Sequence, residues 1–219
     1  MSAESGLNTF RDNGGLWENH RVEEVATPDA FRRNPSLVLE FYNMRYQQLK
    51  TAQPNSAHVA IASLEDNKET EVSVITQNVD DLHERAGSTN VLHLHGELTK
   101  CQSSGNPDFI ADMPTEGIRL GDHCPQGYQL RPNVVWFGEA VPAMEKAATM
   151  LLDADYMLVV GTSLNVYPAA GLVDIAPRQS KIILVDPGEF GHINSRIHHI
   201  KKPATAGVSE AIEKILLNR

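Results

Sequence analysis

Two histidines, His93 and His95, alternate in one short segment of the chain. An imidazole changes charge near neutral pH, so it is well suited to take a proton from a hydroxyl group. The polar segment Gln77-Asn78-Val79-Asp80 lies upstream, and its amide and carboxylate groups can hold hydroxyls or an ordered water where positive charge develops. A structural interpretation stays open, in which the histidines line the polar face of a strand and residues 77–80 cap a helix that Gly87 ends.

Tyr42 and Arg45 are a second pair of residues whose side chains could bind a ligand. Residues three apart are neighbours on a helix, and Arg45 interrupts an otherwise apolar face, where a guanidinium needs an anion. Its planar fork fits a carboxylate, and the Tyr42 hydroxyl can add a second hydrogen bond. The pair predicts either recognition of an acidic ligand or an internal ion pair with one of the 28 acidic side chains.

Three apolar runs are expected to position these residues, at residues 72–76, 156–160 and 181–185. Short continuous apolar runs are typical of parallel strands buried on both faces, and ligands bind at the carboxyl ends of such strands. The loops that follow the runs are Gln77-Asn78, Gly161-Thr162-Ser163 and Asp186-Pro187-Gly188. Together they predict a nucleotide-sized site on an α/β fold, a Rossmann-like parallel sheet with helices on both faces.

Helices are expected where capping residues precede prolines. Thr27-Pro28 and Asn34-Pro35 each pair a capping residue with proline at the first helical position, and the second opens a helix to about Lys50. We also predict helices from Pro54 and over residues 209–218, a strand over residues 134–137, and a loop over residues 1–22.

Residues 100–128 show little periodicity and contain both cysteines, Cys101 and Cys124. A loop of this length is usually functional or a small module of its own. We therefore expect a main domain of residues 1–99 and 129–219, with residues 100–128 as a small irregular insert.

The composition narrows the class of partner. The 219 residues carry a net charge of −9, which opposes binding to a phosphate backbone but not to a basic protein tail. Two cysteines cannot form a disulfide framework. No apolar run approaches a membrane span, and the first residues lack the features of a signal peptide. We expect a cytoplasmic protein that binds neither nucleic acid nor membrane.

Five motifs occur in one order along the chain. They are Ser2-Ala3-Glu4-Ser5-Gly6 with Thr9-Phe10-Arg11-Asp12, TQNVDDLH at residues 76–83, LHGEL at 94–98, LRPNVVWFGE at 130–139 and VGTS at 160–163. In this combination the chain closely resembles the sirtuin family of NAD-dependent protein lysine deacylases over nearly its whole length. Within that family, the segment with Tyr42 and Arg45 resembles the class III signature, which is associated with acidic acyl groups.

The resemblance implies a reaction and its residues. In sirtuins the acyl-lysine carbonyl oxygen attacks the ribose carbon that bears nicotinamide, nicotinamide leaves, and water finally releases lysine and O-acyl-ADP-ribose. His95 corresponds to the family's general base. The residues that the resemblance implies for NAD binding are Ser2, Ala3, Glu4, Thr9, Phe10, Arg11, Gln77, Asn78, Val79, Asp80, Gly161, Thr162, Ser163, Asp186, Pro187, Gly188 and Ala204. From the residues alone, a frayed terminus is the favoured interpretation of the segment at 2–12, with a loop that contacts phosphate and ribose as the alternative.

The same resemblance implies a binding site for an acylated protein lysine. Tyr42 and Arg45 correspond to the residues that receive a succinyl, malonyl or glutaryl carboxylate. The segment ending in Phe-Gly-Glu corresponds to the acyl-lysine tunnel and pairs with the substrate backbone. It supplies the candidate residues Val134, Trp136, Phe137 and Gly138. Trp136 and Phe137 are alternatively ordinary core residues.

The chain departs from the family in two ways. The fingerprint Gly-Ala-Gly-x-Ser-x-x-Ser-Gly follows a buried strand in the family, whereas this sequence opens at Met1-Ser2. We expect a mis-set start, or else a fragment that folds poorly and binds NAD weakly. Many members also carry a zinc module of two C-x-x-C pairs, whereas Cys101 and Cys124 are isolated. We therefore expect no structural zinc.

Two other functions stay open from the sequence. Without the glycine turn, the chain can hold NAD, ADP-ribose or acyl-lysine without turnover. Mono-ADP-ribosyl transfer shares the step in which nicotinamide leaves but uses a different acceptor. The oligomeric state is not predicted.

Overall fold

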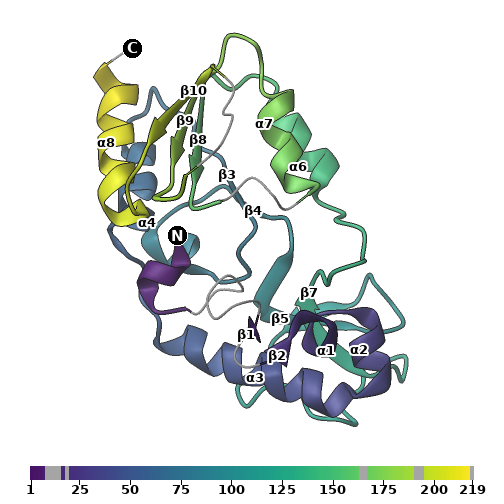
Figure 1. Ribbon diagram of the computed structural model, residues 1–219. Coiled ribbons are helices and arrows are strands. Elements are labelled where there is room, and N and C mark those ends of the chain that lie inside the picture. The colour runs from purple at the N-terminus through teal and green to yellow at the C-terminus, as the bar shows by residue number, and fades with distance from the viewer. Residues whose placement is uncertain (8–15, 18–19, 163–166, 190–194, 218–219) are drawn as a thin grey trace.

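The computed structural model describes residues 1–7, 16–17, 20–162, 167–189 and 195–217 (Figure 1). The elements in the first half of the chain are η1 (Ser2–Ser5), β1 (Leu16–Trp17), β2 (His20–Arg21), α1 (Val22–Val25), α2 (Pro28–Arg33), α3 (Pro35–Thr51), α4 (Ser56–Ser63), η2 (Leu64–Asp66), β3 (Val74–Thr76), α5 (Leu82–Ala86), β4 (Val91–His93) and β5 (Gly96–Ser103). The remaining elements are β6 (Ile110–Asp112), β7 (Leu130–Val134), α6 (Met144–Met150), β8 (Tyr156–Val160), η3 (Ala169–Gly171), α7 (Leu172–Ile175), β9 (Lys181–Val185), β10 (Ile197–Ile200) and α8 (Ala204–Leu217).

Parallel strands with helices on both faces form one part of the molecule. Among the described residues these strands make two sheets, β10-β9-β8 and β3-β4. Strand β9 shows why its sequence is continuously apolar. Ile183 and Val185 join the core beneath α4 and α8, whereas Ile182 and Leu184 pack on the opposite face with Val173 of α7. Burial on both faces is what parallel strands require, and the predicted α/β fold is confirmed.

An antiparallel sheet and helices α2 and α3 form the other part, at the bottom of Figure 1. The sheet order is β6-β5-β7, so residues 100–128 lie between and within paired strands. Its core joins Leu98 and Cys101 of β5 to Val38, Phe41 and Leu49 of α3. Residues 100–128 are therefore less irregular than their sequence indicates, because strand pairing supplies order that hydrophobic periodicity does not reveal.

Side-chain caps explain where several helices begin. Thr27 Oγ1 accepts a hydrogen bond from the Ala30 amide (3.0 Å), and Asn34 Oδ1 accepts one from the Leu37 amide (3.2 Å). A proline follows each cap at the first helical position, where its missing N–H costs nothing. Both predicted starts are confirmed.

Four expectations need correction. Helix α4 begins at Ser56 rather than at Pro54, because Asn55 caps it. Helix α8 begins at Ala204, five residues before the predicted start. Strand β7 ends at Val134, so residues 135–137 are not a strand, and the chain turns instead toward Gly138 at φ +89°. The terminal segment includes the short helix η1 and strands β1 and β2 as well as loop.

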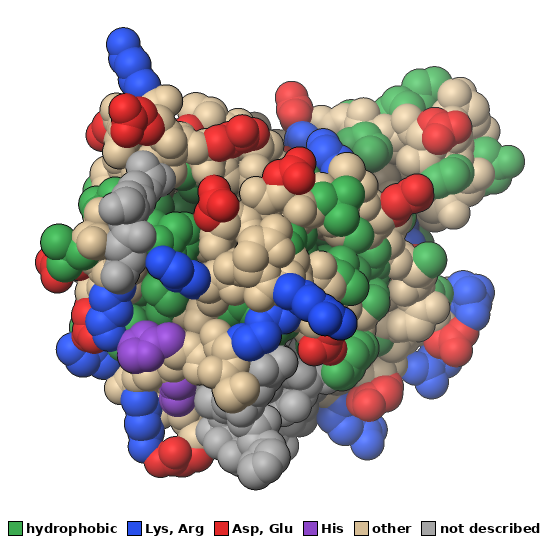
Figure 2. All heavy atoms as spheres, turned by 90° about the horizontal axis from the view of Figure 1, so that it is seen from above, with side chains coloured by type: hydrophobic (Ala, Val, Ile, Leu, Met, Phe, Trp, Pro, Cys, Tyr) green, Lys and Arg blue, Asp and Glu red, His purple; other side chains and the backbone are tan. Residues whose placement is uncertain are grey.

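The surface carries charges of both signs. Figure 2 shows acidic and basic side chains interspersed on the visible face, with apolar side chains exposed between them. Within the described ranges, no helix is long and apolar enough to cross a membrane.

Candidate functional site

The segment from Thr76 to Val79 is fixed through its backbone. Each of its four successive carbonyl groups accepts a hydrogen bond from the segment 93–98. The donors, in order, are the Leu94 amide (2.9 Å), the His95 ring (3.1 Å), the His93 ring (3.0 Å) and the Leu98 amide (2.7 Å). Buried carbonyl groups need such partners, and here they lock the loop that follows β3 against the chain around β4 and β5.

His95 lies in the turn between β4 and β5, not on the strand face that the alternation with His93 indicates. Its Nδ1 bonds the Gln77 carbonyl, which can only accept, so Nδ1 carries the proton and Nε2 keeps its lone pair. Burial lowers the pKa of His95, although the bond to Gln77 partly opposes this shift. The ring is therefore neutral at pH 7 and can accept a proton at Nε2.

Gly96 explains how His95 reaches this position. The residue has φ +78°, and a Cβ there would lie 2.1 Å from the Asn133 carbonyl oxygen. Only glycine permits this approach between β5 and β7. The Val135 amide then donates to the His95 carbonyl (2.9 Å). This backbone hydrogen bond connects the histidine to the segment that follows β7.

Ser2, Asn78 and Asp80 form a polar cluster next to the histidines. Asn78 Nδ2 donates to Ser2 Oγ (2.8 Å), and the Ser2 hydroxyl contacts the buried Asp80 carboxylate. Burial raises the pKa of Asp80, against the opposing effects of Ser2 and of the Leu82 amide. Three of the residues predicted to bind NAD thus come together from segments more than 70 positions apart.

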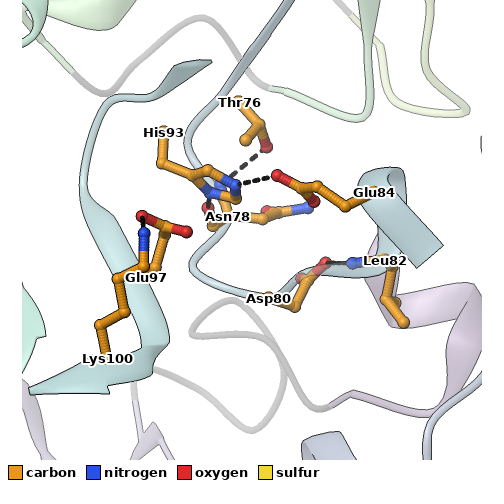
Figure 3. Close-up of polar contacts among 8 residues, drawn as sticks. All are labelled: Thr76, Asn78, Asp80, Leu82, Glu84, His93, Glu97 and Lys100. Atoms are coloured by element: carbon orange, nitrogen blue, oxygen red, sulfur yellow. Dashed lines mark hydrogen bonds and ion pairs between the residues drawn. The ribbon is translucent and has the colours of Figure 1, made fainter. Parts of the chain in front are cut away.

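His93 lies across the same loop from Asp80 (Figure 3). Its Nδ1 bonds the Asn78 carbonyl, and its Nε2 bonds Glu84 Oε1 of α5 at 2.8 Å. Burial opposes a charge on this ring, but the contacts with Glu84, Asn78 and Glu97 outweigh it and raise the pKa of His93. The pKa of His93 is therefore raised, whereas that of His95 is lowered.

The other candidate NAD loops lie at strand ends, as expected. Gly161 follows β8 at φ +63°, and a Cβ there would lie 2.7 Å from the Met1 amino nitrogen, so β8 and the N-terminal segment meet closely. Asp186 follows β9, and its carboxylate accepts a hydrogen bond from the Gly188 amide (2.7 Å) across Pro187. Thr162 is half-buried after Gly161. Thr9, Phe10, Arg11 and Ser163 lie outside the described residues.

Glu4 and Ala204 contact each other. The Glu4 carboxylate accepts from the backbone amides of Ala204 (2.8 Å) and Thr205 (3.0 Å) and from the Thr205 hydroxyl. It thereby caps α8, which explains why that helix begins earlier than its apolar pattern predicts. Ala3, between Ser2 and Glu4, is exposed.

Tyr42 and Arg45 are both buried on α3, with 1% and 8% of their surface exposed. Tyr42 packs against Phe41 and Trp136. The indole N–H of Trp136 approaches the Tyr42 hydroxyl, yet neither atom has a partner at hydrogen-bond geometry within the described residues. Burial raises the pKa of Tyr42, so the phenol stays protonated. Two polar groups with donor hydrogens are thus buried unsatisfied beside a guanidinium, which is an unfavourable arrangement unless an acceptor enters.

Comparisons with known proteins identify the family. Residues 1–168 match the model of the Sir2 family. The chain belongs to the Sir2 family. It is 51% identical over 216 residues to an NAD-dependent protein deacylase of Bacteroides thetaiotaomicron, covering 96% of this chain and 92% of that protein.

Two solved Sir2 structures are similar to the chain. One is a complex of a Sir2 homologue with NAD, at 38% identity and a TM-score of 0.84, covering 99% of this chain and 86% of that one. The other is a Sir2–p53 peptide–NAD⁺ complex, at 30% identity and a TM-score of 0.78, covering 99% and 90%. The predicted family is confirmed.

Two residues of this Sir2-family chain took no role in the sequence interpretation although they lie in the LRPNVVWFGE motif. The Glu139 carboxylate accepts from both terminal nitrogens of Arg131 (2.6 and 3.0 Å) and from the Trp136 amide (2.7 Å). The Arg131 guanidinium also lies over the Trp136 ring, 3.4 Å from its centre. Opposite charges eight positions apart around an aromatic residue are the signal that could have indicated this contact.

The remaining candidate substrate residues lie on both sides of Trp136. Val134 is buried at the end of β7, whereas Phe137 is 50% exposed and Gly138 follows it in a turn. Trp136 is buried and Phe137 is exposed, although the sequence predicts the same surroundings for both.

The two cysteines are buried free thiols. Among the described residues, no three His, Cys, Asp or Glu side chains gather as a metal ion requires. Cys124 Sγ contacts Ser103 Oγ of β5 at 3.2 Å, which anchors the segment between β6 and β7.

Proposed function

We propose that this Sir2-family protein is an NAD-dependent protein lysine deacylase that acts on acidic acyl groups. The observation that carries the proposal is the position of His95. Its neutral ring keeps a lone pair at Nε2, beside the polar loop 77–80 and joined by backbone to the segment that follows β7. A base is thus held between the polar loop 77–80 and the backbone of the segment that follows β7.

The residues around His95 fit a dinucleotide at the level of their chemistry. Ser2, Asn78 and Asp80 offer hydroxyl, amide and carboxylate groups to a ribose and a carboxamide. Gly161 and the Asp186 loop lie at the carboxyl ends of β8 and β9, where nucleotides bind in α/β sheets. NAD, when bound, supplies a ribose carbon that loses nicotinamide and accepts the acyl oxygen.

His95 has one task in this scheme, which is to take a proton from a ribose hydroxyl. Burial keeps its pKa low enough that Nε2 is free at neutral pH, and the Gln77 carbonyl fixes the ring and its tautomer. No other described side chain combines an available imidazole nitrogen with contact to the 77–80 loop, since both nitrogens of His93 are engaged.

Tyr42 and Arg45 support the preference for an acidic acyl group. A succinyl, malonyl or glutaryl carboxylate would supply an acceptor for the buried Tyr42 hydroxyl, and its geometry suits the Arg45 guanidinium. An acetyl group has no carboxylate. Trp136 lies against Tyr42 and is fixed by Arg131 and Glu139, so we infer that it forms the wall along which the acyl chain passes.

The substrate in this proposal is an acylated lysine of a protein. The backbone after Val134 lies beside His95, and we infer that residues 134–138 receive the peptide by strand addition. We propose that residues 1–99 and 129–219 form the domain that binds NAD and that residues 100–128 are its insert. We also propose that the protein acts in the cytoplasm.

The experiment that tests this function is a turnover assay with NAD and a succinyl-lysine peptide. Release of nicotinamide together with O-succinyl-ADP-ribose, identified by mass spectrometry, is the expected result. Binding of NAD by calorimetry without nicotinamide release would contradict the proposal and favour a silent binding module. ADP-ribose attached to protein in place of O-succinyl-ADP-ribose would identify a transferase instead.

A further inference from the structure

His93 has a pattern of contacts that demands a charge. Its Nδ1 faces the Asn78 carbonyl oxygen at 3.0 Å, and its Nε2 faces the Glu84 carboxylate at 2.8 Å. Both partners are acceptors. The Asn78 carbonyl can only accept, and Glu84 stays ionised because the contact with His93 lowers its pKa against the effect of burial. Each ring nitrogen must therefore carry a proton, so His93 is an imidazolium.

Burial opposes the charge on His93, but the acidic groups that face the ring outweigh it. Glu84 of α5, Glu97 of β5 and Asp80 of the 77–80 loop face it as acids. His83 of α5 also faces it, but burial keeps the pKa of His83 at about 4, so that ring is neutral at pH 7. Glu97 is itself paired with Lys100 (2.8 Å) on β5. The His93 side chain is only 7% exposed, which limits screening by solvent.

The charged His93 ring and the His95 ring bond to two successive backbone carbonyls. Asn78 and Gln77 are adjacent residues, and their carbonyls accept from His93 and His95 respectively. A displacement of the Asn78 carbonyl would therefore move the Gln77 carbonyl, which sets the tautomer and direction of the His95 ring. It would also move the Asn78 side chain, which contacts Ser2.

We propose that His93 is a positioning residue that fixes the 77–80 loop through the Asn78 carbonyl and, through Gln77, orients His95, while Glu84 holds the His93 ring in its charged form. This role rests on the proposed function of His95 as the base. Neither residue touches the reacting atoms in this scheme, and α5 contributes to catalysis only by presenting Glu84 to the ring.

Two conservative variants separate the two contacts of His93. In His93→Asn the amide nitrogen takes the place of Nδ1 and can still donate to Asn78, but the contact with Glu84 is lost. In His93→Gln the amide takes the place of Nε2, so Glu84 is still reached but the Asn78 carbonyl loses its donor. We expect His93→Gln to lower kcat about 10- to 100-fold, the scale of a misplaced catalytic group, and His93→Asn to lower it less than about 3-fold.

KM and the pH profile distinguish positioning from general damage. We expect KM for NAD and peptide to change less than about 3-fold in His93→Gln. The acidic limb of kcat should move to lower pH, because the Gln77 bond raises the pKa of His95 and would be weakened. His198→Gln is the matched control, since His198 is exposed on β10 and contacts Lys214. Equal kcat values for the two His93 variants would overturn the proposal.

A readout independent of turnover is nitrogen NMR of the histidine rings in the full chain. At pH 7 we expect both nitrogens of His93 to be protonated and His95 to carry its proton on Nδ1 alone. A neutral His93 would overturn the proposal even in an active enzyme. If the wild type released no nicotinamide, the proposed function would fail, while these spectra would still decide whether Glu84 and His93 form the charged pair.

Discussion

The two ends of the candidate site are built in opposite ways. At the nucleotide end, the loop 77–80 and the side chains of Ser2, Asn78 and Asp80 satisfy one another with hydrogen bonds. At the acyl end, the Tyr42 hydroxyl and the Trp136 indole are buried without a partner among the described residues. The first end is organised before a ligand arrives, as electrostatic catalysis requires. The second is completed by the ligand, which is how a site rejects substrates that lack the matching group.

The largest expected effect is at the nucleotide end. His95→Ala removes the base, and we expect kcat to fall about 10²- to 10⁴-fold, the usual contribution of such a group. NAD binding should remain, because the carbonyls of residues 76, 78 and 79 keep their donors. Parallel turnover assays and calorimetry with NAD measure both quantities. An unchanged rate would remove His95 as the base.

At the acyl end, the effect should depend on the substrate. Arg45→Met keeps an unbranched apolar stem but removes the guanidinium. We expect kcat/KM for a succinyl-lysine peptide to fall about 10- to 100-fold, since a hydrogen bond to a charged group contributes about 1.5–3 kcal/mol. The value for the matched acetyl-lysine peptide should change little. Equal losses on the two peptides would reject the carboxylate role of Arg45.

Low pH should reduce the stability of the protein through two buried histidines on α4 and α5. His58 of α4 and His83 of α5 lie with ring centres 4.9 Å apart, and burial lowers the pKa of each to about 4. In the unfolded chain they titrate near 6.5, so between pH 6.5 and 4 the unfolded state binds more protons and stability falls as pH falls.

We expect this loss to be about 2–3 kcal/mol for each of the two histidines by pH 4.5, measured by urea unfolding at pH 7.5, 5.5 and 4.5. His83→Leu should flatten the pH dependence because one titrating ring is removed. Stability that stays constant from pH 7.5 to 4.5, or a variant with an unaltered slope, would contradict this explanation.

The smallest expected effect sharpens the comparison at the acyl end. Tyr42→Phe removes one neutral hydroxyl, so the rate on succinyl-lysine should fall about 3- to 10-fold, less than in Arg45→Met. Because the hydroxyl has no hydrogen-bond partner among the residues that the structure describes, its loss should leave the stability unchanged or raise it. A variant less stable than the wild type would indicate a hidden partner for Tyr42.

The sequence predicts the parts of the molecule that depend on local rules. The caps at Thr27 and Asn34 and the apolar strands β8 and β9 follow from residue types in consecutive positions. Contacts made by residues distant in sequence could not be predicted in this way. The early start of α8 depends on Glu4, 200 positions away from Ala204.

The candidate site shows the same division. His95 could be singled out from residue type and resemblance, but alternation alone places it on a strand. His93 is charged because of Glu84, which lies nine positions away and acquires its role only when α5 packs against the 77–80 loop. His95 is neutral because burial lowers its pKa.

A crystal structure with NAD and a succinyl-lysine peptide tests the central claim most directly. We predict the nicotinamide ribose beside His95 Nε2 and the 77–80 loop, and the succinyl carboxylate in contact with the Arg45 guanidinium and the Tyr42 hydroxyl. A dinucleotide bound away from that loop, or a carboxylate pointing to solvent while the phenol stays without a partner, would contradict the account.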